Sequence, residues 1–137
     1  MIKNILVTFL LVFTFSSCSL DDDSNTNLSF KTLAIKEAVF PDEFEFGSSY
    51  TVKVTYDLPN GCHSFYNLYY EYKGTSRIVA ITALFDLNAT CTEVIIEKEH
   101  EFVVNVNQRE DYTFRLWKGE DSEGNDIFED IIVPVIN

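Results

Sequence analysis

The chain has 137 residues and a formal net charge of −12, and 46% of its residues are hydrophobic. This length predicts one domain, and the acidic surface disfavours binding to nucleic acid or to anionic lipid head groups. From Leu28 onward there are 36 Val, Ile, Phe, Tyr and Trp residues against 12 Leu and Ala. That ratio excludes an all-helical fold, because branched and aromatic side chains fit a pleated strand surface.

The N-terminus carries one positive charge, Lys3, followed by an apolar run over residues 5–15. At about 1.5 Å per residue this run is too short to cross a hydrocarbon core of about 30 Å. Its length is typical of the apolar core of a signal peptide. We therefore expect residues 1–17 to be an export signal that is removed from the mature protein.

The four residues that end this run, Phe15-Ser16-Ser17-Cys18, resemble the lipobox of bacterial lipoproteins, although Phe15 stands where Leu is usual. The resemblance implies cleavage before Cys18, a diacylglycerol thioether on its sulfur and acylation of its new amine. Several acyl chains, such as palmitate, anchor a protein firmly, whereas one chain does not. The resemblance thus implies a lipid anchor at Cys18.

Ser19 follows the cysteine, which is similar to lipoproteins that Gram-negative bacteria send to the outer membrane. The cluster Asp21-Asp22-Asp23 resembles the anionic tethers that some of these bacteria use for export to the cell surface. The alternative is a solvated leader without an address. Residues 18–27 have too few apolar side chains to pack, so we predict a disordered acidic tether ahead of a folded domain over residues 28–137.

Within residues 28–137, apolar side chains recur at every second position between turn residues, which is typical of strands. Residues 50–56 alternate without exception, whereas residues 77–87 are almost continuously apolar and predict a strand buried on both faces. Pro134 places the end of the last strand at an edge or terminus. The predicted strands are residues 28–40 with a break near Lys36, 50–56, 65–72, 77–87, 92–97, 100–106, 112–116 and 127–135.

Seven or eight short strands predict an all-β, antiparallel sandwich. The segment Asp111-Tyr112-Thr113-Phe114 resembles the start of the penultimate strand of immunoglobulin-like domains. The resemblance implies the broad immunoglobulin or fibronectin-like architecture. It does not extend to antibody domains, because Phe114 stands where they have cysteine.

Cys62 and Cys91 form the remaining cysteine pair, and we expect an exported protein to join them in a disulfide. The closed loop would stabilise the domain by about 3.6 kcal/mol in the chain-entropy model. The alternative is a metal site that also includes His63 and His100. No Cys-x-x-Cys or His-x-x-x-His spacing supports such a site.

No catalytic motif stands out. A hydrolase would need His63 or His100 beside an activated serine, yet Ser64 has no recognisable signature and no Gly-x-Ser-x-Gly is present. We therefore expect neither an enzyme nor a cofactor, with a hydrolase of unrecognised site as an alternative.

The acidic loop over residues 120–126 is a weak calcium candidate, because it brings several oxygen ligands onto a short turn. It does not fit the calcium-loop template, and Gly124 favours a hairpin turn instead. The candidate ligands are Asp121, Glu123, Asn125 and Asp126.

Strict alternation along residues 65–72 places Tyr66, Leu68, Tyr70 and Tyr72 toward the core and Phe65, Tyr69 and Glu71 outward. The same pattern turns Arg115 and Trp117 outward. Exposed flat rings beside carboxylates are typical of sugar-binding faces and also anchor protein partners. The alternative is that a loop or the second sheet covers this face. The candidate ligand-binding residues are Phe65, Tyr69, Arg115 and Trp117.

Together these features predict a lipid-anchored, non-enzymatic binding or adhesion module of the cell envelope. Its expected binding partner is a glycan or an envelope protein, and binding to nucleic acid is not expected. An accessory lipoprotein that holds an outer-membrane complex together is the alternative among non-enzymes.

Overall fold

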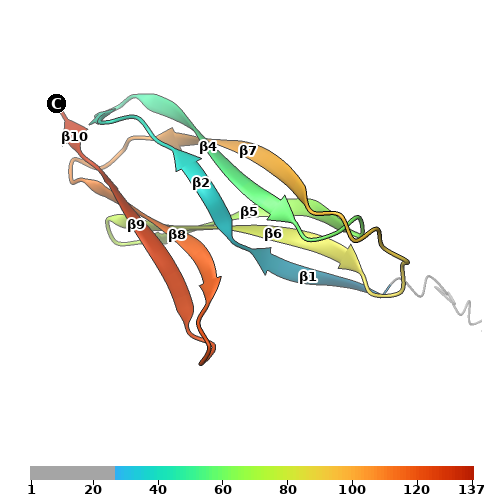
Figure 1. The fold of residues 1–137 in the computed structure, drawn as a ribbon. Helices are drawn as coiled ribbons and strands as arrows, with labels where there is room; N and C mark the ends of the chain where they lie inside the picture. The colour runs from blue at the N-terminus through green and yellow to red at the C-terminus, as the bar shows by residue number, and fades with distance from the viewer. Residues whose placement is uncertain (1–26) are drawn as a thin grey trace, which may run out of the picture.

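The computed structural model describes residues 27–137, and every regular element in this part of the chain is a β-strand (Figure 1). No helix within this range is long and apolar enough to cross a membrane. The predicted export signal and the predicted lipid-bearing Cys18 lie outside the described residues. The strands are β1 (Leu28–Leu33), β2 (Ile35–Val39), β3 (Phe44–Glu45), β4 (Ser49–Leu58), β5 (His63–Lys73), β6 (Ser76–Asp86), β7 (Ile96–Asn105), β8 (Tyr112–Glu120), β9 (Asp126–Val133) and β10 (Val135–Ile136).

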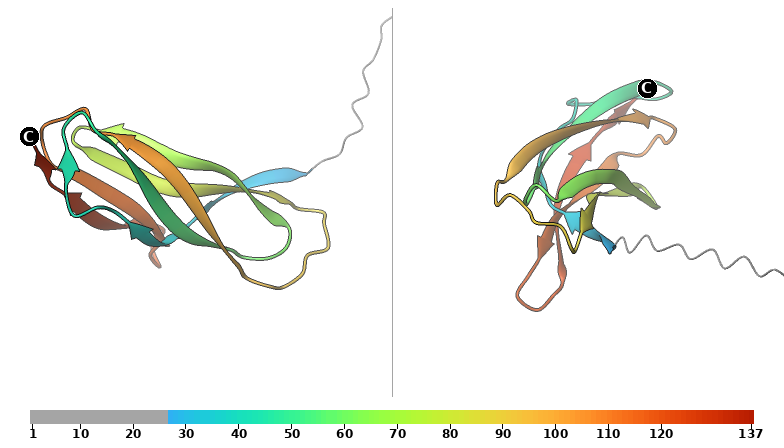
Figure 2. Two further views of the ribbon diagram at one scale, coloured as in Figure 1. Left: turned by 90° about the horizontal axis from the view of Figure 1, so that it is seen from above. Right: turned by 90° about the vertical axis from the view of Figure 1, so that its right-hand side faces the viewer.

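Two sheets make up most of the domain and pack face to face (Figures 1 and 2). The five-stranded sheet contains β1, β5, β6, β8 and β9, and the three-stranded sheet contains β2, β4 and β7. β3 and β10 form a short parallel pair. The predicted all-β fold is confirmed.

The prediction of purely antiparallel sheets is wrong, because β6 and β8 run parallel from Ser76 opposite Thr113 to Val79 opposite Leu116. In immunoglobulin domains, the hairpin that corresponds to β5–β6 places its first strand beside the penultimate strand of the domain. Here β5 lies on the far edge of β6, so the second strand of the β5–β6 hairpin is the neighbour of β8. The two strands of a hairpin have opposite directions, and exchanging them changes an antiparallel contact into a parallel one.

The alternating segment predicted over residues 50–56 forms most of β4, which pairs with β7 along its whole length. Val52, Val54 and Tyr56 are buried, whereas the residues between them are more exposed. On β7, Val104 is buried as the alternation predicts. Period-two patterning therefore identified the central strand of the three-stranded sheet.

The first predicted strand breaks at Ala34, two residues before the expected position, and the chain crosses there from one sheet to the other. β1 pairs with β6, and β2 pairs with β4. Leu33 and Ile35, on either side of the crossing, are both buried in the core between the two sheets. The Lys118 ammonium secures it by donating to the backbone oxygens of Ile35 and Lys36 at 2.8 and 2.9 Å.

Strand β6 is the buried centre of the five-stranded sheet, as its continuous apolar sequence predicts. Val79, Ala80 and Ile81 are all buried. Near its start, the buried guanidinium of Arg77 donates to the backbone oxygens of Gly74 and Ser76 at 3.0 and 2.9 Å.

The strand predicted over residues 92–97 is wrong, because residues 87–95 form a loop and only its last two residues join β7. The predicted disulfide is confirmed: Cys62 and Cys91 are joined, with their Cα atoms 5.2 Å apart. The Gly61 amide donates to the backbone oxygen of Thr92 at 3.0 Å. The disulfide and this backbone hydrogen bond hold the segment against the β4–β5 turn, outside the strand pairing.

The core between the sheets is dominated by aromatic rings. Phe44 makes edge contacts with Tyr112 and Phe114 at centroid distances of 5.3 and 6.0 Å. The sequence pattern missed β3, which places Phe44, because a strand of two residues shows no periodicity. Its Phe44 amide donates to the Pro134 oxygen at 2.8 Å, which draws the end of the chain onto the core.

The Tyr112 hydroxyl lies inside the domain and accepts a hydrogen bond from the Asn107 amide at 3.1 Å. We expect Tyr112→Phe to lower the free energy of unfolding by about 1–2 kcal/mol, because the amide loses its partner. Urea denaturation measures this loss. Tyr66→Phe removes a hydroxyl from an exposed ring and should cost less than about 0.5 kcal/mol; equal losses in the two variants would contradict the role of this bond.

Candidate functional site

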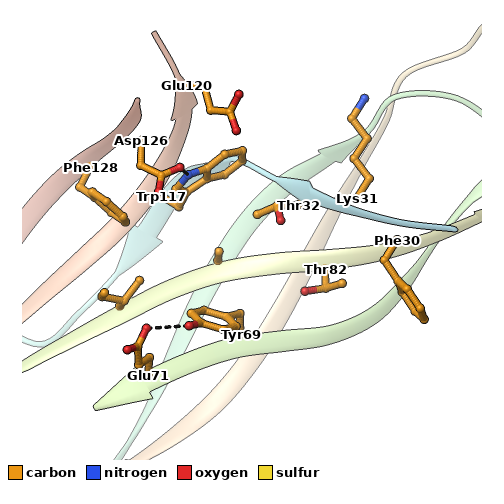
Figure 3. A pocket seen from close by; sticks show the side chains of 12 residues that line it. Phe30, Lys31, Thr32, Tyr69, Glu71, Thr82, Trp117, Glu120, Asp126 and Phe128 are labelled. Carbon is orange, nitrogen blue, oxygen red and sulfur yellow. Dashed lines mark hydrogen bonds between the residues drawn. The ribbon is translucent and has the colours of Figure 1, made fainter. Parts of the chain in front are cut away.

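The outer face of the five-stranded sheet carries an open hollow of about 610 Å³. We call it the aromatic hollow, because four of its lining residues are aromatic, as Figure 3 illustrates. Two of the four predicted ligand-binding residues, Tyr69 and Trp117, are brought together in it, along with Asp126 from the calcium candidates. Its lining is Phe30, Lys31, Thr32, Tyr69, Glu71, Ile78, Ala80, Thr82, Trp117, Glu120, Asp126 and Phe128.

The hollow arises from the sizes of the side chains on neighbouring strands. β6 presents the small residues Ala80 and Thr82 on this face, while Val79 and Ile81 point into the core. Tyr69 on β5 stands opposite Ala80, and Trp117 comes from β8 on the other side of β6. Large rings on both sides of small residues leave a depression between them (Figure 3).

Hydrogen bonds orient the polar edges of both rings. The Tyr69 hydroxyl donates to Glu71 Oε2 at 2.6 Å, and the Trp117 ring N–H donates to Asp126 Oδ1 at 2.8 Å. The bond to Glu71 raises the pKa of Tyr69, which keeps the phenol protonated. Each ring is thus held beside a carboxylate, and each carboxylate keeps a second oxygen that can accept a hydrogen bond from a ligand.

The charges that line the hollow are mostly negative. Glu71, Glu120 and Asp126 contribute carboxylates, and Lys31 contributes the one ammonium. With Thr32 and Thr82, these groups offer hydrogen-bond acceptors and donors between the aromatic sides of the hollow. The arrangement suits a ligand that has apolar faces and hydroxyl edges.

Arg115 also faces outward, as predicted, but it does not line the hollow. Its Nε donates to Asp130 Oδ1 at 3.0 Å, and its guanidinium lies 4.7 Å from the ring centroid of Phe128. Arg115 therefore supports one wall of the hollow through Phe128.

The outward placement predicted for Phe65 is wrong. A β-bulge between Phe65 and Asn67 adds one residue to β5 and reverses the alternation there. The Phe65 ring stacks on His100 with a centroid distance of 4.5 Å. Tyr66, predicted to face inward, is 54% exposed and packs against Phe30. Because Phe65 and Tyr66 are both aromatic, the pattern of apolar residues does not reveal which of the two faces the core.

Sequence reasoning missed the residues that β1 and β6 contribute to the hollow and also Phe128 of β9, and it named Asp126 of β9 only as a calcium candidate. Phe30 and Thr32 pair with Leu84 and Thr82 of β6, and Phe128 pairs with Trp117. The outward direction of Trp117 predicts the same direction for Phe128 only once the pairing of β8 with β9 is known. The missing information was strand register, which short-range patterns do not contain.

The two histidines contact aromatic and amide groups. His63 Nδ1 lies 2.7 Å from Asn60 Oδ1, and its ring stacks on Phe85. Burial, assisted by the charge of Lys31, lowers the pKa of His63, so its imidazole is neutral at pH 7. The Ser64 hydroxyl donates to a backbone oxygen at 3.4 Å, and neither histidine lines the hollow.

The acidic loop forms the β8–β9 hairpin turn, with Gly124 at a φ of +83°. The Asp121 carboxylate accepts hydrogen bonds from the amides of Glu123 and Asn125 at 2.8 and 2.9 Å. The bonds from Asn125, followed by that from Glu123, lower the pKa of Asp121. Within residues 27–137 no three His, Cys, Asp or Glu side chains gather as metal ligands would.

One comparison with known proteins gives a match. The model of a family described as the ORF11 beta-sandwich domain matches residues 52–130. The matched range includes Tyr69, Trp117 and Asp126 but not the residues that β1 contributes. No curated protein and no solved structure matches.

Proposed function

This chain belongs to the ORF11 beta-sandwich domain family, and from that premise we propose that its folded domain is a non-enzymatic binding module that holds a glycan in the aromatic hollow. The observation that carries this proposal is the placement of Tyr69 and Trp117 on one open face, each bonded to a carboxylate. Pyranose rings stack their C–H faces on aromatic rings, and their hydroxyls donate to carboxylates. The hollow supplies both kinds of contact.

The negative lining restricts the glycans that fit. Glu71, Glu120 and Asp126 face one ammonium, Lys31, in a chain whose formal net charge is −12. A sulfated, phosphorylated or uronic-acid polymer would be repelled by this field. The proposed ligand is therefore a neutral or amine-bearing saccharide.

The proposed setting is the cell envelope of a Gram-negative bacterium. The Phe15–Cys18 segment supports a lipid anchor on Cys18 in the outer membrane, and the cluster Asp21-Asp22-Asp23 supports export to the outer surface. A glycan-binding module in this position would meet polysaccharides of the surroundings or of the envelope. The Tyr112–Asn107 bond resembles the tyrosine corner of immunoglobulin-like domains and supports a relation to that architecture.

The test is a glycan array probed with the detergent-solubilised full chain, followed by titration calorimetry with the best saccharide. Trp117→Ala and Tyr69→Ala should each weaken binding at least about tenfold, because a stacked aromatic anchor is worth more than about 1.4 kcal/mol. Tyr69→Phe keeps the ring and should retain most of the affinity.

Phe46→Ala is the matched control. The Phe46 ring is exposed to a similar extent as that of Tyr69, but it lies beneath the Arg109 guanidinium and outside the hollow. This variant should bind like the parent chain. An array without any saccharide signal would contradict the glycan proposal. An envelope protein that co-purifies with the chain and is lost on Trp117→Ala would favour a protein partner instead.

A further inference from the structure

One end of the sandwich exposes several aliphatic side chains beside few charged ones, Asp86 and Glu93. The end is formed by the 59–62 turn, the 87–95 loop and the start of β1, and the C-terminus lies at the opposite end (Figures 1 and 2). Leu28, Leu87, Val94 and Ile95 are 49%, 62%, 59% and 68% exposed there. Glu93 is the only charged residue in the 87–95 loop. We call this surface the apolar end.

The apolar end is held in place by covalent and backbone contacts. The Cys62–Cys91 disulfide ties the 87–95 loop to the β4–β5 turn. The Leu87 amide donates to the Asn27 oxygen at 2.9 Å, which joins the loop to the first described residue. A Cβ at Gly61 would overlap the Thr92 hydroxyl oxygen, so a larger residue there would displace the Thr92 side chain. The aliphatic side chains are therefore displayed by an ordered loop.

The apolar end is also where the chain enters the domain. Asn27 and the 87–95 loop lie side by side, and Cys18 precedes Asn27 by nine residues. Nine residues span at most about 30 Å when fully extended. A lipid attached at Cys18 would keep the apolar end nearer to the membrane than the opposite end.

We propose that the apolar end docks on a lipid surface, with Leu28, Leu87 and Val94 entering the interface of a zwitterionic membrane. This inference rests on the lipid anchor of the proposed function. Exposed aliphatic side chains gain free energy when they enter the headgroup–acyl boundary, and this contact adds to the hold of a lipid anchor. The face that carries β7 is charged, with Glu97 and Glu99 paired to Lys36 and Lys53 and with Lys98 and Glu101 also exposed, so lipid would contact the apolar end and not this face.

Docking in this manner would have a consequence for the aromatic hollow. The hollow lies on a face of the sheet, and its lining does not include Leu87, Val94 or Ile95. End-on contact leaves that face in water, where a soluble glycan can reach it. Lipid contact and ligand binding therefore use separate residues and can be tested separately.

The experiment uses the full chain, produced with its own N-terminal residues and reconstituted into phosphatidylcholine vesicles with and without brominated acyl chains. Val94→Trp places a fluorescent reporter at the apolar end. Val103→Trp is the matched control, because Val103 is 60% exposed on β7 toward the opposite end. Trp117 contributes the same background to both variants.

Brominated lipid should quench roughly half of the emission added by Val94→Trp, because an interfacial side chain lies within about 10 Å of the headgroup boundary. The emission added by Val103→Trp should be unchanged. Adding Leu87→Asp to Val94→Trp should restore the emission, since a carboxylate opposes entry into the interface.

Three other outcomes overturn the proposal in distinguishable ways. If no variant floats with the vesicles, the anchor fails as well. If the chain floats and the reporters at positions 94 and 103 are quenched equally, docking fails while the anchor and the glycan proposal stand. If sedimentation shows a dimer that Leu87→Asp dissociates, a second copy of the chain covers this end.

Discussion

Phe114→Ala is expected to lower the free energy of unfolding by about 3–5 kcal/mol, a larger loss than we expect from any other single substitution in this domain. Phe114 is fully buried between the two sheets. Its ring contacts Phe40, Phe44 and Tyr112 at centroid distances of 4.4, 6.0 and 5.8 Å. Truncation removes these contacts and leaves a cavity that rings from several strands cannot fill without moving.

Urea denaturation followed by tyrosine and tryptophan fluorescence measures this loss. Ile132→Ala is the control: Ile132 lies on the neighbouring strand β9, opposite Thr113, and is 66% exposed. It should change the free energy of unfolding by less than about 0.5 kcal/mol. Similar losses in the two variants would mean that the core is not centred on Phe114.

Removal of the disulfide is expected to have the second largest effect. The Cys62→Ser/Cys91→Ser double variant opens a loop with a sequence separation of 29 residues. The chain-entropy model gives a loss of about 3.6 kcal/mol for such a loop, within a usual range of about 2–5 kcal/mol. That is a large part of the about 5–15 kcal/mol that stabilises a typical domain.

Thermal unfolding with and without dithiothreitol supplies an independent measurement. The parent chain should lose stability on reduction, whereas the double variant should be insensitive to the reductant. Saccharide binding should survive in both at a temperature where they are folded, because the disulfide lies outside the aromatic hollow. An unchanged melting temperature of the parent chain under reducing conditions would contradict the prediction.

The local pattern of side chains determined much of the fold. The alternation of Val52, Val54 and Tyr56 identified β4, and the continuous apolar run from Arg77 identified β6 as a central strand. Both signals depend only on which face of a strand is buried, and that information is contained in neighbouring residues. The disulfide was predictable because the chain offers one cysteine pair after the proposed lipid site.

Strand order and register could not be obtained in this way. The parallel contact between β6 and β8 depends on which strand of the β5–β6 hairpin reaches β8, and residues far apart in the chain decide it. The bulge after Phe65 is a feature of the register between β5 and β6. One additional residue there exchanged the faces of Phe65 and Tyr66, although no feature of the sequence marks it.

The sequence by itself determined that Tyr69 and Trp117 point away from the core, since each lies in an alternating strand with a buried opposite face. Only the tertiary structure decided that they form one site, because the rings come from β5 and β8 and meet across the small residues Ala80 and Thr82 of β6. The direction of a side chain is set by its immediate neighbours along the strand. Its distance from another ring is set by the pairing of strands that are distant in the chain, and that pairing follows from the packing of the whole core.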